Sequence, residues 1–308
     1  MDESEQVKRT REIEEVTNLY FIHPVSRTLV TYFARWGVQP NAVSVLGMML
    51  GAAAAVAYYA YDYWPMAVLG FLLMIGWHVM DGADGQLARL TGQTSEIGKV
   101  LDGLCDYGTF VLVYLSLAAA SAQALGPWVW IVAVLAGLSH AAHAGAYEFE
   151  RQSYDFWVHG KASARPIPPD VLRRELPDRE GVARLFGYLH LAYLHVQYRV
   201  AGVDWSLINE LEGALCEGDD QAQVREAYRA VQRPAVRRWA LLCSNYHTLA
   251  IFIACLAGSP LAYFLFEIVV LNAIFAGLRY MQAQRNKTLR LMLATSKHSS
   301  YSALSSVE

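Results

Sequence analysis

The sequence predicts an all-α integral membrane protein: a six-transmembrane-helix bundle with an N-terminal interfacial helix and a cytoplasmic helical insert between spans four and five. Two observations predict this fold. Of the 308 residues, 55% are hydrophobic and 17% are charged, with a mean hydropathy of +0.22, which is more apolar than an ordinary soluble domain. Apolar runs of about 20 residues, long enough to cross a bilayer, also recur along the chain. The runs are 43–61, 65–80, 103–122, 127–146, 239–257 and 260–280.

The cationic residues predict the orientation of these spans. None of the 25 Lys and Arg residues lies in 36–88, 100–150 or 239–278. When the N-terminus is placed in the cytoplasm, the short loops on the opposite side carry no lysine or arginine, which is the positive-inside pattern. We therefore expect both termini of this multi-pass protein to be cytoplasmic.

The spans divide the chain into five expected regions. These are an N-terminal lead with an interfacial amphipathic helix (1–36), spans one to four with an acidic motif at 81–106 (37–146), a cytoplasmic insert (147–238), spans five and six (239–284), and a tail that is basic and then Ser-rich (285–308). Within the insert, a Pro-rich link at 165–170 precedes two helical patterns at 178–200 and 204–232.

The segment 24–36 places its apolar residues on one helical face. Leu29, Val30, Phe33 and Trp36 share that face, which favours a helix lying in the membrane surface. An ordinary helix packed on the bundle is the alternative. The break at 39–41 then precedes the first span, and Asn41 or Ser44 is expected to cap it.

An acidic motif lies between the second and third spans. Asp81 and Asp84 are about one helical turn apart, as are Asp102 and Asp106. If the chain turns near Gly92, two antiparallel helices bring the four carboxylates together. Ligands that are all oxygen suit Mg²⁺, Mn²⁺ or Ca²⁺ rather than zinc. Four carboxylates exceed the charge of one divalent ion, which favours two, and paired ions stabilise a phosphoryl transfer.

The residues around the aspartates fit phosphate chemistry. Gly85, Ala88 and Gly98 are small, so a phosphate or a backbone can come close. The planar, charged guanidinium of Arg89 can donate two hydrogen bonds to a phosphate. A carboxylate that does not bind metal could act as a general base. A lone aspartate at a membrane edge is more often a cap, but a structural ion-pair cluster of four would need more cations than Arg89 and Lys99. The spacing also lacks the alternating oxygens of an EF-hand.

The spacing of the motif resembles a known signature. It reads Asp81-x-x-Asp84-Gly85-x-x-Ala88-Arg89, then Gly98 after eight residues, and then Asp102 and Asp106, each after three more. This pattern resembles the complete signature of the CDP-alcohol phosphotransferase (CDP-alcohol phosphatidyltransferase) family. Six spans, a surface helix and the Pro40-Asn41 pair are similar to that family too. The resemblance covers roughly 20–146 and 239–285, and the insert departs from the short connection of smaller members.

The resemblance implies a membrane enzyme of phospholipid biosynthesis. It would move a phosphatidyl or phosphoalkyl group from a CDP-alcohol, normally CDP-diacylglycerol, to a hydroxyl acceptor and release CMP. Asp81, Asp84, Asp102 and Asp106 would bind Mg²⁺ or Mn²⁺, with two ions, and Asp106 would also be the base. The expected CDP-binding residues are Asn41, Gly85, Ala88, Arg89 and Gly98.

The acceptor is less well defined by the sequence. Lys99, His143, Arg151 and Arg279 are candidate acceptor-binding residues. A cationic pocket of this kind favours an inositol-type or phosphorylated polyol acceptor, and transfer of an amino-alcohol phosphate is the alternative within the family. His140 and His143 could bind a metal, but the sequence offers no evident third nitrogen or sulfur ligand. Hydrogen bonding between helices is the other reading of these histidines, and also of Asn245, His247, Glu267 and Asn272.

Two other classes of protein also use membrane carboxylates. A prenyltransferase would show two separated Asp motifs, whereas this chain has one, and a cation transporter or a lipid-binding bundle would favour acids in mid-span. The expected partners are the lipid bilayer, the CDP-alcohol and the alcohol. A homodimer through Gly47, Gly51 and Ala55 is a further expectation, although the same residues could pack inside one chain. No basic aromatic face supports nucleic-acid binding.

Overall fold

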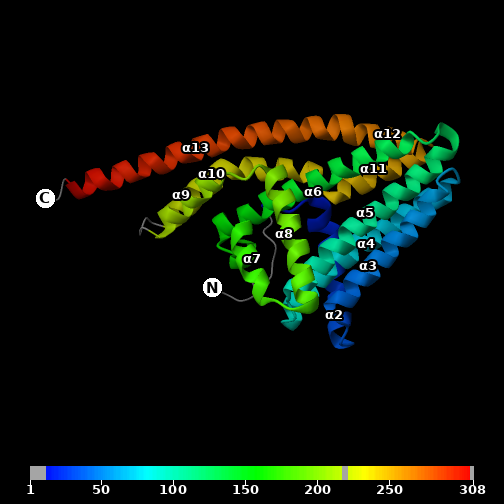
Figure 1. The fold of residues 1–308 in the computed structure, drawn as a ribbon, viewed down its shortest axis with the longest axis horizontal. Helices are drawn as coiled ribbons and strands as arrows, with labels where there is room; N and C mark the ends of the chain where they lie inside the picture. The colour runs from blue at the N-terminus through cyan, green and yellow to red at the C-terminus, as the bar shows by residue number, and fades with distance from the viewer. Residues whose placement is uncertain (1–11, 217–220, 306–308) are drawn as a thin grey trace.

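The computed structural model describes residues 12–216 and 221–305, and every regular element in them is a helix (Figure 1). The elements up to the fourth span are η1 (Asn18–Ile22), α2 (His23–Arg35), α3 (Pro40–Tyr59), α4 (Trp64–Thr91), α5 (Glu96–Leu125) and α6 (Val129–His159). They are followed by η2 (Ala162–Ala164), α7 (Pro169–Glu175), η3 (Leu176–Asp178), α8 (Gly181–Ala201), α9 (Trp205–Cys216) and α10 (Gln221–Trp239). The last elements are η4 (Ala240–Leu242), α11 (Ser244–Leu256), α12 (Pro260–Phe266), η5 (Glu267–Leu271) and α13 (Asn272–Ser305).

Six of the described helical segments are long and apolar enough to cross a membrane, which confirms the predicted bundle. They extend beyond the apolar runs, because a helix continues through polar residues until a local signal stops it. The second span ends at Gly92 and the fourth at Gly160, both in the left-handed conformation that favours glycine. As a result, α6 continues to His159, well past the boundary expected at residue 146.

Small residues allow the first three spans to pack closely. A Cβ on Gly51 would collide with the Thr109 side chain of α5, and a Cβ on Gly47 would lie 3.1 Å from Met80 of α4. Ala55 is also buried within the chain. The small residues expected to support a homodimer therefore pack inside one protomer. They no longer provide an argument for a dimer.

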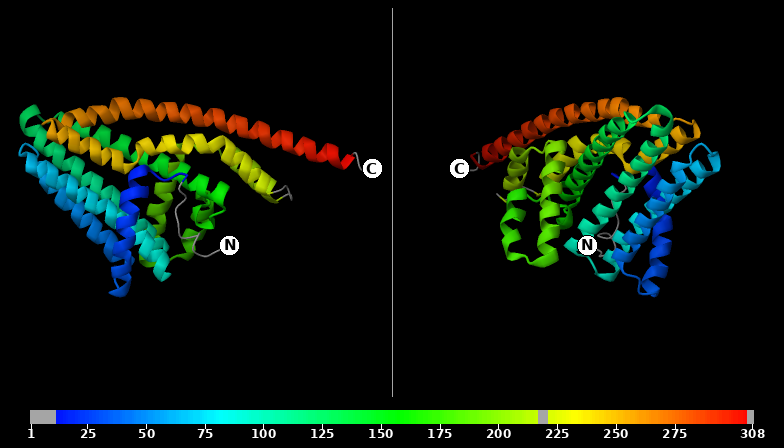
Figure 2. Two further views of the ribbon diagram at one scale, coloured as in Figure 1. Left: turned by 180° about the vertical axis from the view of Figure 1, so that it is seen from behind. Right: turned by 45° about the vertical axis from the view of Figure 1, so that its right-hand side comes forward.

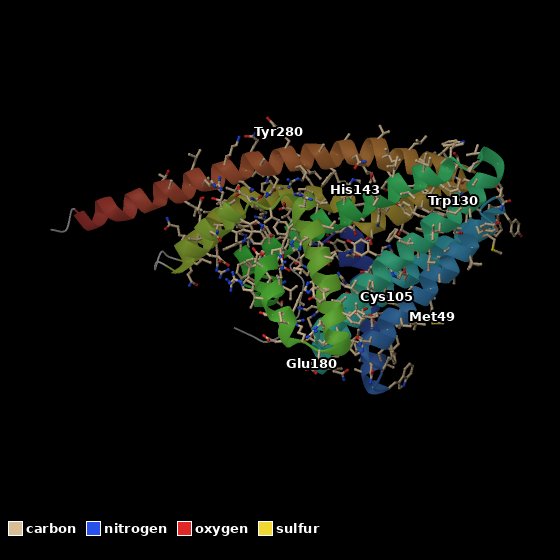
Figure 3. The ribbon with its side chains drawn as sticks, viewed as in Figure 1. Met49, Cys105, Trp130, His143, Glu180 and Tyr280 are labelled. Carbon is tan, nitrogen blue, oxygen red and sulfur yellow. The ribbon has the colours of Figure 1, made fainter. Side chains whose placement is uncertain are left out.

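The outer surface of the bundle is apolar. Met49 of α3 is 63% exposed, and Trp130 of α6 is also exposed (Figure 3). Large apolar side chains at the surface are expected where lipid, rather than water, is the solvent. Together with the six apolar helices, this makes the chain a multi-pass membrane protein.

The N-terminal helix α2 packs on α4. The Ser26 hydroxyl donates a hydrogen bond of 2.7 Å to the Val79 carbonyl, and Val30 is buried in a cluster with Ala83 of α4. Trp36, expected on the same face, is 73% exposed. One side of α2 therefore packs on the bundle, as the alternative reading of this segment expects, and Trp36 at its end is exposed.

The insert is helical and packs against the bundle. Helix α8 matches the first predicted pattern and packs against α6 and α5, while α10 packs against α6 and α13 (Figure 2). The second predicted pattern corresponds to α9 and α10, with 217–220 between them outside the described residues. The insert thus touches the helix that carries Asp102 and Asp106.

Candidate active site

The turn between α4 and α5 brings the acidic motif together. Gly92 ends α4 with a φ of 67°, and the next amide, that of Gln93, donates to the Ala88 carbonyl over 2.9 Å. Ser95 then begins α5, where its hydroxyl accepts the Gly98 amide at 2.9 Å. Both helices then pack against α3, and aspartates that are distant in sequence face each other across the space between them. The turn lies where the sequence predicts it.

The four aspartates, which we call the acidic cluster, line the space between α4 and α5. Carboxylate oxygens of Asp81, Asp102 and Asp106 lie within 4.8 Å of one another. Asp84 is only 5% exposed, and its side chain also hydrogen-bonds to that of Asp102. Two carboxylates this close repel each other unless they share a proton or a cation. The arrangement therefore fits a divalent cation, and its all-oxygen ligands fit Mg²⁺ or Mn²⁺.

Ser44 holds Asp84 in place, a role that sequence reasoning missed. Its hydroxyl donates to Asp84 Oδ2 over 2.5 Å, and the Gly85 amide donates to Oδ1. The expectation that Asn41 or Ser44 caps the first span was wrong. The capping position is Gln39 in extended backbone, and Pro40 occupies the first helical position, where its fixed φ suits the start of a helix.

The expected CDP-binding residues lie beside the acidic cluster. A Cβ on Gly98 would lie 3.2 Å from Asn41 Oδ1, so the first turns of α3 and α5 meet there. Gly85 lies close to the Arg89 guanidinium. A Cβ added to Gly85 would be 3.4 Å from a guanidinium nitrogen. Ala88 is half-buried on the same helix. These five residues thus lie on turns of α3, α4 and α5 next to those that carry the aspartates.

The insert contacts the residue that follows Asp106 in the sequence. The next residue, Tyr107, hydrogen-bonds to Tyr193 of α8, and their ring centroids are 6.1 Å apart. Burial raises the pKa of the Tyr193 hydroxyl, so it stays protonated at neutral pH and can donate. The sequence gives no signal for this pairing, because Tyr193 lies in the insert, far along the chain from Tyr107.

The structure places the four acceptor candidates in separate surroundings. Lys99 is exposed in the first turn of α5. Arg151 pairs with Glu148 through contacts of 2.8 and 2.5 Å and lies 3.8 Å from Asp155. The Arg279 guanidinium packs tightly against Gly202, at the end of α8. These cations do not form one pocket among the described residues.

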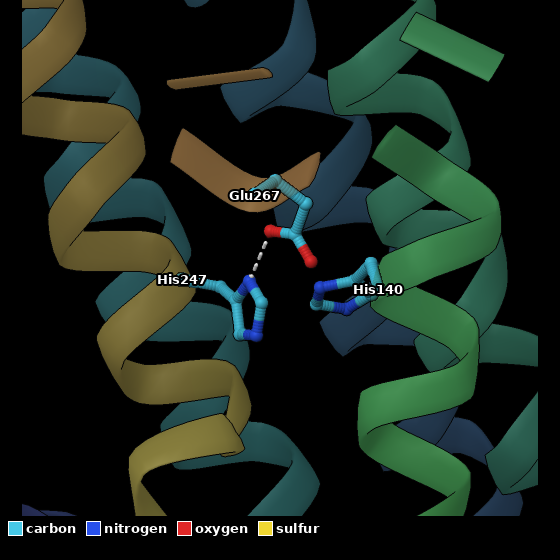
Figure 4. Close-up of side chains that lie close together, drawn as sticks. All are labelled: His140, His247 and Glu267. Atoms are coloured by element: carbon cyan, nitrogen blue, oxygen red, sulfur yellow. Dashed lines mark ion pairs between the residues drawn. The ribbon is translucent and has the colours of Figure 1, made fainter. Parts of the chain in front are cut away.

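His143, the fourth candidate, belongs to a second polar group in the bundle. We call His140, His143, His247 and Glu267 the histidine–glutamate cluster. His143 Nδ1 lies 2.9 Å from Glu267 Oε1, and its Nε2 lies 3.0 Å from Asn272 Oδ1. His247 Nδ1 lies 2.8 Å from Glu267 Oε2 (Figure 4). Hydrogen bonding between helices, one of the two readings from the sequence, is therefore present.

Comparison with known proteins agrees with the motif. Residues 38–159 match the model of the CDP-alcohol phosphatidyltransferase family, as the sequence resemblance predicts. This stretch contains the whole acidic cluster and His140 but neither His247 nor Glu267.

Individual relatives fall into two branches. Ethanolaminephosphotransferase 1 of Homo sapiens is 28% identical over 147 residues, which cover 40% of this chain and 36% of the relative. Choline/ethanolaminephosphotransferase 1 of Arabidopsis thaliana is 24% identical over 127 residues, covering 38% and 32%. Archaetidylinositol phosphate synthase of Pyrococcus horikoshii is 32% identical over 73 residues, covering 24% and 37%. The chain thus matches about a third of the length of these relatives.

Proposed function

Because residues 38–159 match the model of the CDP-alcohol phosphatidyltransferase family, we propose that the chain is a membrane phosphotransferase of phospholipid biosynthesis. It transfers a phosphate-linked group from a CDP-alcohol to a hydroxyl acceptor and releases CMP. One observation carries the proposal: carboxylates from two facing helices approach within 4.8 Å, inside the matched stretch. Fold resemblance alone would not support a reaction.

The proposed reaction makes one bond and breaks one. The acceptor oxygen bonds to the β-phosphorus of the donor, the bond from that phosphorus to the CMP oxygen breaks, and CMP leaves. The acceptor proton passes to Asp106. Asp106 suits this role because its side chain is half-buried on α5, beside the carboxylates of Asp81 and Asp102.

The other residues hold the reactants. Asp81, Asp84 and Asp102 are the proposed ligands of Mg²⁺ or Mn²⁺, with Asp106 shared, and Ser44 fixes the orientation of Asp84. The ions, two in the proposed state, would offset the negative charge of the diphosphate. Arg89, Gly85, Ala88, Gly98 and Asn41 are the proposed contacts of the CDP part.

The donor and the acceptor define two versions of this function. The first pairs CDP-diacylglycerol with an inositol-type or phosphorylated polyol acceptor, bound near Lys99 and Arg151. However, Arg151 already has two acidic partners, Glu148 and Asp155, so its charge does not require a phosphorylated acceptor. The longer matches to ethanolaminephosphotransferases support the second version, which uses an amino-alcohol donor.

CMP release from a panel of substrates separates these versions. Purified protein is supplied with Mn²⁺ or Mg²⁺ and either CDP-diacylglycerol or CDP-ethanolamine, each with inositol, inositol phosphate, glycerol phosphate and diacylglycerol. CMP release from CDP-diacylglycerol with inositol, inositol phosphate or glycerol phosphate would support the first version. CMP release from CDP-ethanolamine with diacylglycerol would support the second. Release of pyrophosphate from a prenyl diphosphate, or cation transport without CMP, would contradict the whole proposal.

We also propose that both termini face the cytoplasm, which places the acidic cluster on the side where cytidine nucleotides are made. The positive-inside distribution of lysine and arginine supports this orientation. Membrane-impermeant labelling of single cysteines placed at Asp62 and at Gln93 tests it. The cysteine of Asp62→Cys should react from outside intact cells, and that of Gln93→Cys should react only after lysis.

A further inference from the structure

The histidine–glutamate cluster brings three potential metal ligands together from distant parts of the chain. One ligand atom each of His140, His247 and Glu267 lies within 4.8 Å of the other two. They come from α6, α11 and the π-helical segment η5, which interrupts the sixth span. Their exposed fractions are 5%, 1% and 0%. Such π-helical interruptions are frequently found at functional sites.

Two imidazole nitrogens in this cluster lack partners. His140 Nδ1 and His247 Nε2 are buried and have no hydrogen-bond partner in the described part of the chain. Buried polar groups in native proteins almost always have a partner. Hydrogen bonding therefore explains why His143 is buried, because both of its ring nitrogens have partners. It does not explain the burial of one ring nitrogen each of His140 and His247.

The charge of Glu267 also needs compensation. A buried carboxylate is normally paired with a cation or coordinated to a metal, and no lysine or arginine occurs in 100–150 or 239–278. The groups around it are neutral or titratable: Tyr263 donates to Oε2 over 2.8 Å, and Tyr114 lies 3.4 Å from the same oxygen. The available countercharges are thus an imidazolium or a bound ion.

We propose that His140, His247 and Glu267 bind a divalent transition metal, with Zn²⁺ as the representative ion. Two imidazoles and one carboxylate form a ligand set typical of zinc and of non-haem iron. It differs from the all-oxygen acidic cluster, which suits Mg²⁺ or Mn²⁺. The ion would draw the ligand atoms together, since zinc–ligand distances are about 2.0–2.2 Å. His143, bonded to the other oxygen of Glu267, would orient the carboxylate as such partners do.

The bound ion would join spans four, five and six. His140 also lies against Phe110, with ring centroids 4.1 Å apart, and Phe110 is one helical turn beyond Asp106 on α5. Through Phe110 the ion would therefore stabilise the turn of α5 that follows Asp106. This inference does not depend on the reaction proposed above.

Metal content of the whole protein tests the proposal. Protein purified without chelator is dialysed against trace Zn²⁺ with excess Mg²⁺, which fills oxygen sites but competes poorly for imidazole. We expect about one zinc per chain, an X-ray absorption spectrum with imidazole nitrogen in the first shell, and a lower melting temperature after zinc removal. Protein that retains no zinc, or that shows an oxygen-only shell, would overturn the proposal.

Two variants locate the ion. His140→Ala removes a ligand whose Nδ1 has no hydrogen bond to lose, so we expect the zinc to disappear. His78→Gln is the matched control, because His78 is also a buried histidine of the bundle but bonds to Thr248 at 2.9 Å. Equal zinc in His140→Ala and wild type would place the ion elsewhere. If His140→Ala does not fold, the spectrum and the zinc-dependent melting of the wild type decide the question.

Discussion

The acidic cluster and the histidine–glutamate cluster both lie inside the bundle, but the chain builds them differently. The acidic cluster comes from one hairpin, 81–106, and three of its four carboxylates are half-buried near the turn. The histidine–glutamate cluster comes from three spans, is almost fully buried, and includes ligands outside the stretch matched by the family. The first has the exposure that substrate binding needs, whereas the second has the burial of a group that stabilises helix packing.

The largest expected effect separates activity from stability at the acidic cluster. Asp106→Asn should lower the rate of CMP release by about a thousandfold, since a positioned general base contributes roughly 10²–10⁴. The melting temperature should not fall, because relief of repulsion among the carboxylates offsets the lost interactions. Asp62→Asn, in the exposed connection between α3 and α4, is the control and should keep full activity. Wild-type rates in Asp106→Asn would remove its role as base.

The same contrast explains what could be predicted from sequence. The acidic cluster was predictable because helical spacing and a Gly-containing turn act within 26 residues. The six spans were predictable because lipid selects for apolar composition. The partners of Glu267 were not, since the pairing of α6, α11 and η5 depends on how whole helices pack. The contact of Tyr107 with Tyr193 was hidden for the same reason, as was the length of α6, which depends on a stop signal at Gly160 rather than on hydropathy.

The second prediction concerns Glu267, where we expect a substitution to lower stability rather than the rate of the reaction. Glu267→Gln removes the charge that faces His143 and His247, and losing one member of a buried ionic group costs roughly 3 kcal/mol or more. We expect a clearly lower melting temperature in detergent, with activity lost only in proportion to unfolded protein. Glu226→Gln is the control: this carboxylate is 72% exposed and its partner Arg229 is 38% exposed, and pairs open to solvent contribute about 0–1 kcal/mol. Equal melting of the two variants would contradict a stabilising role for the cluster.

The smallest expected effect concerns the insert, in which Tyr193 of α8 hydrogen-bonds to Tyr107, the residue after Asp106. Tyr193→Phe removes a hydroxyl that hydrogen-bonds to Tyr107 and leaves the ring contact in place. A neutral hydrogen bond contributes about 1 kcal/mol, so we expect a change of about fivefold in the KM for the acceptor and little change in kcat. Tyr188→Phe is the control, because Tyr188 lies on the same helix but is 53% exposed. If the two variants behave alike, α8 supports the bundle without shaping the acceptor site; if kcat falls as in Asp106→Asn, the insert acts on the chemistry itself.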